Sequence, residues 1–472
     1  MEDKTMEARE YDIVVIGGGP GGYVAAIRAA QLGAKVAVVE KERIGGTCLN
    51  RGCIPTKTMV RSTEVYLAAK GAEKYGVEVE GQVRPNFARI MARKNEVVST
   101  LVEQVIKLME AHRIDIYHGV GTILKPGLVR VRADSGSQDL SSRKIIIATG
   151  SVPAIPPIPG TDLPGVLTTR QLLDLEELPK SLVIIGGSTI GLEFACIFNA
   201  LGTSVSVVGR RTFLKRADQS LARRLRPSLV RRGIKVVIGL TFKEIVPADG
   251  KLRVVYERKG KEEYVEGEKV LLATGRWPYT EGLGVEELGI KMERRAILVN
   301  EYMETNIPGI YAIGDVLGTY MMAHTASYQG EVAVENALGH RRAADYRAVP
   351  ACIFTSPEIA SVGLTEQEAK EKGIDFQVAR FPFSASGKAM ALGETEGQVR
   401  IIHEKGSGKV LGVHIMGPHA TDLIAEGVMA IQLGATVKDI AETIHGHPTL
   451  SEAVMEAAKA GAFGEAIHYR KI

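Results

Sequence analysis

Residues 11–22 read YDIVVIGGGPGG, and this stretch decides the fold of the 472-residue chain. Its apolar, β-branched half predicts a strand over 11–16, and the glycines predict a tight turn after it. An alanine-rich segment then reaches Leu32 and predicts a helix that stops at Gly33, before a second apolar strand over 35–40. Strand, helix and strand at this spacing predict a βαβ unit.

The glycine spacing in this turn is typical of a dinucleotide site. Gly17 makes the turn, Gly19 leaves room for a pyrophosphate against the backbone, and Gly22 lets helix and strand pack closely. The helix start adds N–H groups and a partial positive charge for the phosphates. Glu40 ends the second strand, where a carboxylate would bind the diol of a ribose. An ordinary glycine turn would not require that carboxylate, so the context favours nucleotide binding.

The same pattern returns in the middle of the chain. A strand is predicted over 181–185, followed by a glycine turn over 186–191, a helix to Leu201 and a strand over 205–208. Each half also ends in a similar tetrad, Ala-Thr-Gly-Ser at 148–151 and Ala-Thr-Gly-Arg at 273–276. The two halves therefore indicate an internal duplication of one nucleotide-binding fold.

The second glycine turn differs from the first in two ways that concern the choice of nucleotide. Gly186 and Gly191 hold the outer positions, but Ser188 replaces the middle glycine. The next strand is followed by Arg210 and Arg211, where an NAD site would carry Asp or Glu. Without that carboxylate a 2′-phosphate is not repelled, and a guanidinium can bind it, which favours NADP over NAD. The alternative is that both arginines belong to a solvated basic loop.

Composition indicates a globular protein of several domains. Hydrophobic residues make up 45% and charged residues 24% of a chain that is too long for one ordinary core. The net charge is only +4, and no basic run interleaved with aromatics predicts a nucleic-acid surface. No apolar run approaches the ~20 residues of a spanning helix, and the first residues do not form a secretory signal. We therefore expect a cytoplasmic protein without a membrane segment.

The last third of the chain has a different pattern. A proline-rich crossing over 153–160 predicts a first domain boundary, and from Val349 strands alternate with long helices. The strands are expected over 397–402 and 409–415, and the helices over 420–432 and 450–462. This arrangement predicts a separate α+β domain.

Two of the four cysteines lie close together, in the segment GGTCLNRGCIPTK at 45–57. Cys48 and Cys53 form neither a CxxC motif nor a zinc site, because no second pair completes a tetrahedron, and we expect no metal. On an ideal helix, residues five apart rise ~7.5 Å, which is too far for a disulfide. The backbone must therefore be distorted near Gly52 and Pro55 if the two sulfur atoms bond. The alternative is a pair of buried reduced cysteines.

Four segments resemble the dihydrolipoamide dehydrogenases among the class I pyridine nucleotide-disulfide oxidoreductases. They are 45–57, IYAIGD at 310–315, FTSPEIASVGLT at 354–365 and HGHPTLSE at 445–452, and they occur in the order of that family. The resemblance covers essentially the whole chain. It implies an α/β fold like that of glutathione reductase, with two Rossmann-like domains for FAD and NAD(P) and a C-terminal α+β dimerisation domain.

The resemblance also implies domain bounds and partners. The expected domains are an FAD-binding domain over 1–150, an NAD(P)-binding domain over 151–276, a central domain completing the FAD site over 277–348, and a dimerisation domain over 349–472. The expected partners are a second copy of the chain, in a homodimer, and a lipoyl domain or another lipoate-carrying protein as substrate.

Roles for individual residues follow from the same resemblance. Cys48 is expected to exchange with the substrate, and Cys53 to contact the flavin. Lys57 would lie near flavin N5 and pair with Glu193, because an ammonium stabilises negative charge on the reduced ring. The other residues expected at the FAD are Gly17, Gly19, Gly22, Glu40, Gly46, Thr47, Gly121, Thr149, Gly150, Asp315, Ala323 and His324. Those expected at the NAD(P) are Gly186, Ser188, Gly191, Glu193, Arg210, Arg211 and Gly275.

His447 is the expected acid–base residue, contributed to the site by the other subunit and oriented by Glu452. A base with a pKa near neutrality suits the deprotonation of a dithiol, and a carboxylate partner fixes its tautomer. A surface histidine, or a metal ligand together with His445, is the alternative. The predicted activity is oxidation of protein-bound dihydrolipoamide to lipoamide through the Cys48–Cys53 disulfide and FAD, with reduction of NAD(P).

Two other functions stay open. An NADPH-dependent disulfide or metal reductase would suit the second glycine turn, which resembles that of mercuric reductase at Ser188 and Arg210. Mercuric reductase carries a C-terminal cysteine pair, however, whereas the last cysteine here is Cys352. A non-catalytic structural flavoprotein is the second alternative, and the presence of Cys48, Cys53 and His447 argues against it.

Overall fold

The computed structural model describes residues 9–210, 213–214 and 217–470, which form two compact units. The first unit takes its residues from Met1–Ile155, Thr168–Glu177 and Gly275–Ala344, and the second from Pro156–Leu167, Leu178–Thr274 and Asp345–Ile472. Each unit is therefore assembled from segments that are far apart in the sequence.

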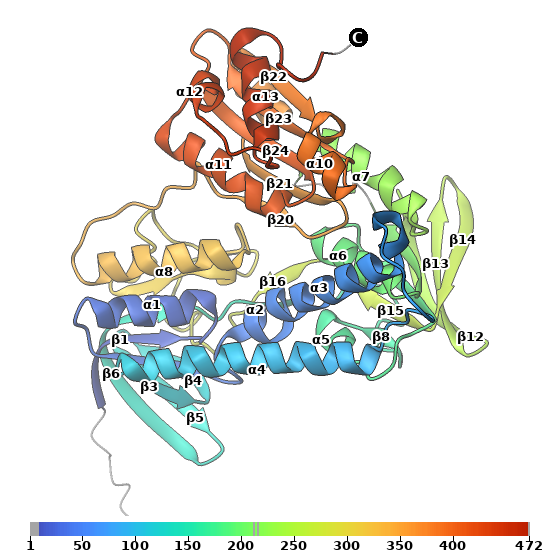
Figure 1. Cartoon of the computed structure of the whole chain (residues 1–472). Helices are drawn as coiled ribbons and strands as arrows, with labels where there is room; N and C mark the ends of the chain where they lie inside the picture. The colour runs from blue at the N-terminus through green and yellow to red at the C-terminus, as the bar shows by residue number, and fades with distance from the viewer. Residues whose placement is uncertain (1–8, 211–212, 215–216, 471–472) are drawn as a thin grey trace, which may run out of the picture. The chain divides into compact units, whose positions relative to one another are not determined.

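The first unit is built on the βαβ unit expected from the opening stretch. Strand β1 (Arg9–Ile16), helix α1 (Pro20–Gln31) and strand β2 (Val36–Glu40) follow one another, and the two strands pair in parallel. The alanines on the inner face of α1 are fully buried, which lets helix α8 (Ala323–Ala337) lie beside it (Figure 1). A Cβ on Gly330 of α8 would lie 2.8 Å from the Gly21 carbonyl oxygen, so this packing requires glycine.

The sheet of the first unit is mixed rather than purely parallel. Its order is β3-β2-β1-β6-β5-β4, and β19 pairs in parallel with β6. The bounds are β3 Asp115–His118, β4 Val120–Lys125, β5 Leu128–Ala133, β6 Gly136–Ile147 and β19 Ile310–Ala312. The antiparallel strands β4 and β5 carry an alternating burial pattern, whereas β2 is buried on both faces. The sequence stretch before the first tetrad did not lead us to expect this antiparallel part.

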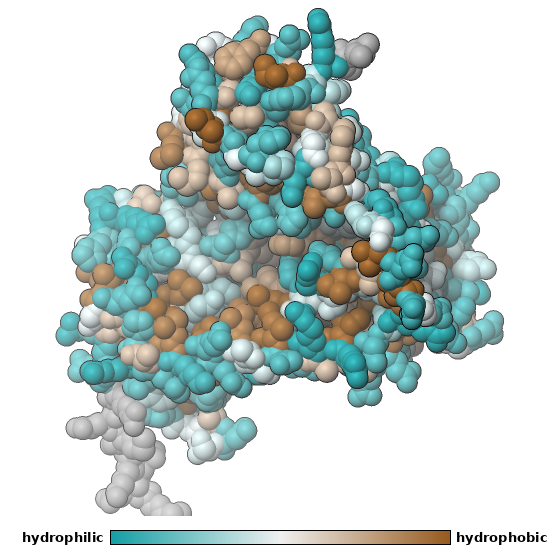
Figure 2. Space-filling model, in the orientation of Figure 1, coloured by the Kyte–Doolittle hydropathy of each residue, from teal (hydrophilic) through white to brown (hydrophobic). Residues whose placement is uncertain are grey.

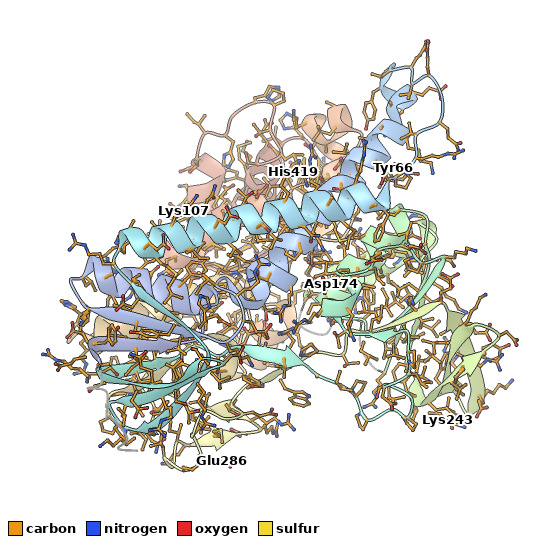
Figure 3. The ribbon with its side chains drawn as sticks, turned by 90° about the horizontal axis from the view of Figure 1, so that it is seen from below. Tyr66, Lys107, Asp174, Lys243, Glu286 and His419 are labelled. Atoms are coloured by element: carbon orange, nitrogen blue, oxygen red, sulfur yellow. The ribbon has the colours of Figure 1, made fainter. Side chains whose placement is uncertain are left out.

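Three helices follow β2 before the chain returns to the sheet. They are α2 (Gly46–Arg51), α3 (Cys53–Lys70) and the 25-residue α4 (Phe87–Ala111). Figure 3 shows α4 along the unit, with Lys107 towards its C-terminal end and Tyr66 on the adjoining α3. Buried α4 side chains recur at intervals of three or four residues, at Phe87, Met91, Lys94, Val98, Val102, Val105 and Met109. Within the described ranges, no helix is long and apolar enough to cross a membrane, and the cytoplasmic location stays a prediction.

Small elements complete the first unit. They are η1 (Ala72–Tyr75), β7 (Ser151–Pro153), α5 (Thr169–Leu172), β16 (Arg276–Pro278), β17 (Met292–Glu293), β18 (Ala296–Ile297) and η2 (Gly314–Leu317). Strands β7 and β16 pair antiparallel, which places the residues after the two tetrads next to each other.

The second unit contains the repeat of the βαβ pattern. Strand β9 (Ser181–Ile185) has the predicted bounds, and helix α6 (Thr189–Ala200) and strand β10 (Ser204–Gly209) lie within one or two residues of expectation. The parallel sheet has the order β11-β10-β9-β15-β8, with β8 Val166–Leu167, β11 Lys235–Ile238 and β15 Lys269–Leu272. Helix α7 (Gln219–Arg231) precedes β11, and an antiparallel sheet of β12 (Thr241–Ala248), β13 (Lys251–Arg258) and β14 (Lys261–Gly267) precedes β15.

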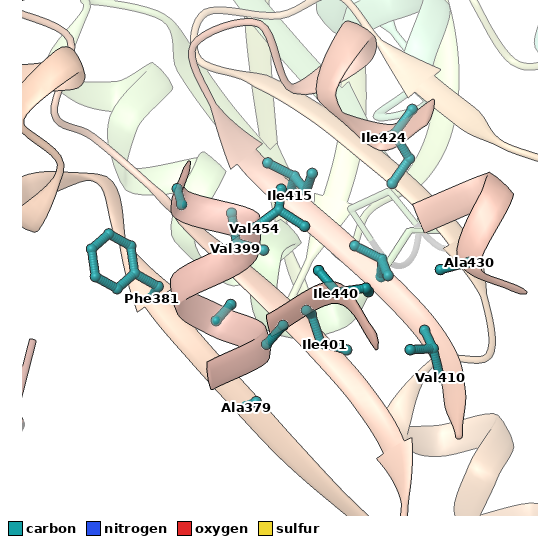
Figure 4. Close-up of a cluster of buried hydrophobic side chains, with 14 of the residues drawn as sticks. Ala379, Phe381, Val399, Ile401, Val410, Ile415, Ile424, Ala430, Ile440 and Val454 are labelled. Atoms are coloured by element: carbon teal, nitrogen blue, oxygen red, sulfur yellow. The ribbon is translucent and has the colours of Figure 1, made fainter. Parts of the chain in front are cut away.

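The expected α+β part forms the remainder of the second unit. An antiparallel sheet has the order β20-β21-β24-β23-β22, with bounds β20 Ala351–Ile353, β21 Glu358–Gly363, β22 Phe376–Pro382, β23 Gln398–Glu404 and β24 Val410–Gly417. Its helices are α9 (Glu366–Glu371), α10 (Gly387–Leu392), α11 (Ala420–Leu433), α12 (Val437–Glu442) and α13 (Glu452–Phe463), with η3 at Phe383–Ala385. Val399 and Ile401 of β23 pack with Val454 of α13 in one apolar cluster (Figure 4).

A buried arginine joins this antiparallel sheet to helix α7. Arg400 of β23 is 2% exposed, hydrogen-bonds Ser220 and Glu366, and lies 3.8 Å from a carboxylate oxygen of Asp218. Asp218 in turn caps α7 by accepting from the backbone N–H groups of Ser220 and Leu221, both at 3.0 Å. One ionic cluster thus fixes the start of α7 against β23.

Replacing Arg400 with Met should lower the apparent melting temperature markedly. The substitution leaves the buried Asp218 without its opposite charge, and breaking a buried pair in this way costs about 3–5 kcal/mol. Arg380→Gln is the matched control, because Arg380 also lies near Glu366, at 3.7 Å, but is half exposed. Calorimetry of both variants checks this, and equal melting temperatures would contradict the role given to Arg400.

Candidate active site

The first glycine turn leaves an open space in front of the start of α1. Gly17 has φ +110, and a Cβ on Gly22 would lie 1.8 Å from the Gly17 carbonyl oxygen. On Gly19, in contrast, the nearest atom that a Cβ would meet is the Cα of Gly46, at 3.9 Å. The backbone N–H groups of α1 therefore face a space that a pyrophosphate can enter, and the residues present fit FAD.

Glu40 lies at this turn, as expected from its place at the end of β2. One carboxylate oxygen accepts from the Gly18 N–H at 2.7 Å and the other from the Glu42 N–H at 2.8 Å. Burial raises the pKa of Glu40, and the Gly18 N–H and the charge of Lys41 only partly offset it. The carboxylate thus stabilises the glycine turn and has acceptor capacity left for ribose hydroxyls.

The remaining residues expected at the FAD all belong to the first unit. Gly46 and Thr47 begin α2, Gly121 lies on β4, Thr149 and Gly150 follow β6, Asp315 lies on η2, and Ala323 and His324 begin α8. Thr149 donates from its hydroxyl to the Tyr279 carbonyl at 2.6 Å. No ligand contact of these residues is established by the fold itself, so their roles at the FAD remain predictions.

Arg276 is a residue of this site that the sequence analysis did not select. Its guanidinium donates to the Ser151 hydroxyl at 2.7 Å and to the Ser151 carbonyl at 2.6 Å, and lies 3.9 Å from Asp315. Burial lowers the pKa of Arg276, while the charges of Asp315 and Cys53 raise it. The guanidinium thus lies between the expected ribityl partner and the cysteine pair. In the sequence, the signal for Arg276 was its place as the last residue of the second tetrad, Ala-Thr-Gly-Arg at 273–276.

The cysteine pair lies across a break between two helices. Cys48 is on α2 and Cys53 is the first residue of α3, and the helices separate at Gly52, with φ −138 and ψ −106. A Cβ on Gly52 would lie 3.0 Å from the Thr47 carbonyl oxygen. The backbone distortion expected from the spacing is therefore confirmed, and it brings the two side chains together.

The side chains of Cys48 and Cys53 lie within hydrogen-bonding reach of each other in this structure. A hydrogen bond with Cys53, burial and the negative charge of Cys53 raise the pKa of Cys48, against a smaller lowering by the charge of Lys57. Cys53 is the first residue of α3, where the helix dipole favours an anion. Both cysteines are in the dithiol form here, so the disulfide is a proposal.

His447 and Glu452 form a hydrogen-bonded pair in the second unit. Nδ1 of His447 lies 2.8 Å from one oxygen of Glu452, and the other oxygen accepts from the Thr449 N–H at 2.8 Å. The imidazole is 81% exposed, which leaves Nε2 accessible to a substrate. The neighbouring His445 instead faces Glu426, at 2.9 Å, and within the described part of the chain no three His, Cys, Asp or Glu side chains gather around a metal site.

The second glycine turn has the geometry of the first. Gly186 has φ +132, a Cβ on Gly191 would lie 2.4 Å from the Gly186 carbonyl oxygen, and Ser188 donates to the Ala273 carbonyl at 3.1 Å. Arg210 is exposed after β10, whereas Arg211 lies outside the described residues. Gly275, also expected at the nucleotide, belongs to the first unit.

Glu193 is buried on α6 and accepts from the Phe354 N–H at 3.0 Å. Lys57 belongs to α3 of the first unit and Glu193 to the second. Their expected pairing therefore stays a prediction.

Comparison with known proteins places these features in a family. The family described as "Pyridine nucleotide-disulphide oxidoreductase" matches residues 11–330, and its "dimerisation domain" matches residues 349–458. A dihydrolipoyl dehydrogenase of Bacillus subtilis is 43% identical over 98% of this chain and 100% of its own length. One of Geobacillus stearothermophilus is 41% identical over 98% of each chain.

Solved structures agree with this assignment. LpdA of Mycobacterium tuberculosis superposes with a TM-score of 0.89 at 29% identity, over 96% of this chain and 99% of its own. The HOCl-induced flavoprotein disulfide reductase RclA of Escherichia coli, in a Cu(II) complex, superposes with a TM-score of 0.86 at 30% identity, over 96% and 99% of the two chains.

Replacing Glu40 with Gln should weaken FAD binding about tenfold. The amide cannot be ionised, and one of its two oxygens becomes an NH₂ group that faces an N–H donor. Glu42→Gln is the matched control, because Glu42 is a surface carboxylate that pairs with Arg51. Reconstitution of the apoprotein followed by flavin fluorescence measures both constants, and identical constants would exclude Glu40 from the FAD site.

Proposed function

The chain belongs to the pyridine nucleotide-disulphide oxidoreductase family, and on this premise we propose that it oxidises dihydrolipoamide carried by a lipoyl protein. Like the other members of this family, it is an FAD-dependent oxidoreductase that uses a pyridine nucleotide. The observation that carries the choice of substrate is the cysteine pair Cys48 and Cys53, in a chain matched over almost its full length by dihydrolipoyl dehydrogenases.

In this proposal the cysteines exchange disulfides with the substrate. A substrate thiolate attacks the Cys48 sulfur of the Cys48–Cys53 disulfide, and Cys53 leaves as a thiolate next to the start of α3. The second substrate thiol then attacks the mixed disulfide, which releases lipoamide and leaves Cys48 reduced. The position of Cys53 as the first residue of α3 supports this assignment, because the helix dipole there stabilises the leaving thiolate.

His447 removes the proton from the substrate thiol. Glu452 binds Nδ1, so Nε2 is the basic nitrogen, and the carboxylate stabilises the imidazolium that forms. FAD, which the glycine turn after β1 and Glu40 would hold, would supply the acceptor for the electron pair of the dithiol and the donor of a hydride to the pyridine nucleotide. Lys57, whose charge acts on Cys48, and Glu193 would complete this side of the site.

A homodimer would bring His447 of one protomer to the cysteines of the other. The dimerisation-domain match covers the segment that carries His447. The same part of the chain exposes large apolar side chains, some visible as brown atoms over α11 and α12 in Figure 2. They are Met429, Leu433, Ile444, Phe463 and Ile467, which are 56–97% exposed. Apolar surface of this extent is typical of an interface.

A metal or disulfide reductase is the second candidate. It is favoured by the likeness to RclA, which was solved in a Cu(II) complex. Turnover rates with dihydrolipoamide and with Cu(II) as the substrate, each measured at saturating nucleotide, distinguish the two functions.

Replacing either Cys48 or Cys53 with Ser should abolish dihydrolipoamide oxidation, because serine cannot form the disulfide. Bound FAD should remain, since neither sulfur lies at the glycine turn. Cys352→Ser is the control, and its turnover should be that of the original chain. Stopped-flow reduction by dihydrolipoamide measures the loss, and normal turnover in either active-site variant would end this proposal.

NADP should support dihydrolipoamide oxidation at a rate at least comparable with NAD, because Arg210 can bind a 2′-phosphate and no carboxylate is expected to repel it. Arg210→Gln should raise the KM for NADP about tenfold and leave that for NAD unchanged. An NADP rate below about a tenth of the NAD rate would contradict the preference.

A further inference from the structure

A second histidine–carboxylate pair lies one helical turn from His447 and Glu452. Glu456 follows Glu452 by four residues on α13, so the two carboxylates lie on the same face of that helix. Glu456 is 2% exposed, whereas its partner His468, in the segment after α13, is 71% exposed. A carboxylate this deeply buried requires several partners.

Glu456 obtains most of those partners from the C-terminal segment. One oxygen accepts from the backbone N–H groups of Ile467 at 2.8 Å and His468 at 3.0 Å. The other oxygen lies 3.2 Å from Nδ1 of His468 and 3.4 Å from Nζ of Lys459. The chain reverses at Gly464, with φ +91. Glu456 therefore holds the returning segment along α13.

Both carboxylates on this face of the helix have a lowered pKa. Burial raises the pKa of Glu452, but the Thr449 N–H, the hydrogen bond and charge of His447 and the charge of His468 outweigh it and lower the pKa. Burial likewise raises the pKa of Glu456, and the bonds from His468 and Lys459 lower it. His468 therefore acts on both carboxylates.

The exposed imidazole of His447 depends on this support. Among the hydrogen bonds that the structure records for His447, one leads from Nδ1 to Glu452. Because this bond orients the imidazole, a change in the position of the Glu452 carboxylate changes the orientation of the base. We propose that Glu456 and His468 are positioning residues for the acid–base pair: their contact fixes the C-terminal segment along α13, one helical turn from Glu452, and so keeps the Glu452 carboxylate directed at His447. This inference rests on the proposed function, in which His447 is the base.

Replacing Glu456 with Gln should lower kcat for dihydrolipoamide oxidation about tenfold, as is usual when a supporting partner of a catalytic side chain is lost. His468→Gln should lower kcat in the same direction, by about threefold or more. The KM for dihydrolipoamide should stay within about twofold in both variants, because neither side chain contacts the substrate. Reduction of ferricyanide by NAD(P)H does not use His447, and its rate per bound FAD should be unchanged.

Two variants serve as matched controls. Glu465→Gln breaks the ion pair of Glu465 with Arg470 in the same C-terminal segment, at 3.6 Å, and His419→Gln removes an exposed histidine that pairs with Asp422 at 3.7 Å. Both should keep the kcat of the original chain. If Glu456→Gln does not retain FAD, His468→Gln decides the question, because it leaves both backbone bonds of Glu456 in place.

The proposal is overturned if His468→Gln has the kcat of His419→Gln, if the loss lies in KM alone, or if ferricyanide reduction falls in proportion. Each of these outcomes requires that the original chain oxidises dihydrolipoamide. If it does not, the proposed function fails instead.

Discussion

The close contact of helix and strand at the glycine turn is the constraint on which the nucleotide sites depend. Gly22 lies so near the Gly17 carbonyl that any side chain would collide with it, and Gly191 repeats this contact with Gly186. Because the helix starts against the strand, its N–H groups face the ligand space rather than a neighbouring side chain. The same contact brings Glu40, at the end of the adjacent strand, into a hydrogen bond with Gly18.

The redox chemistry requires a different kind of local break. Two cysteines five apart cannot meet on one helix, and the chain solves this by ending α2 and starting α3 at Gly52. The break also places Cys53 at a helix N-terminus, where a thiolate is stabilised, and leaves Cys48 with the raised pKa. One backbone feature thus both brings the two side chains together and gives them different surroundings.

Two buried charged side chains hold distant segments of the second unit together. Arg400 joins β23 to the cap of α7 through Asp218, and Glu456 joins α13 to the C-terminal segment. Each group is too costly to bury alone, so its partners have to be present in the folded state. The segments that supply those partners are thereby held in one arrangement, and in the case of Glu456 that arrangement adjoins the acid–base pair.

The sequence by itself determined the elements whose signal is local. Both βαβ units and the need for a break near Gly52 follow from residues that lie close together in the chain, because turn geometry and helix periodicity act over a few positions. The pairing of His447 with Glu452 was expected from the family resemblance, and the structure shows their hydrogen bond. The antiparallel strands β4 and β5 and the sheet β12–β14 were missed, since their pairing depends on partners rather than on pattern.

Only the tertiary structure decided the contacts between distant segments. Arg276 meets Ser151 across 125 positions, and Arg400 meets Ser220 across 180. His468 reaches Glu456 only because the chain reverses after α13. No local propensity encodes such contacts: a buried ionic group selects its partner by distance and desolvation in the folded state, and these exist only once the segments have packed.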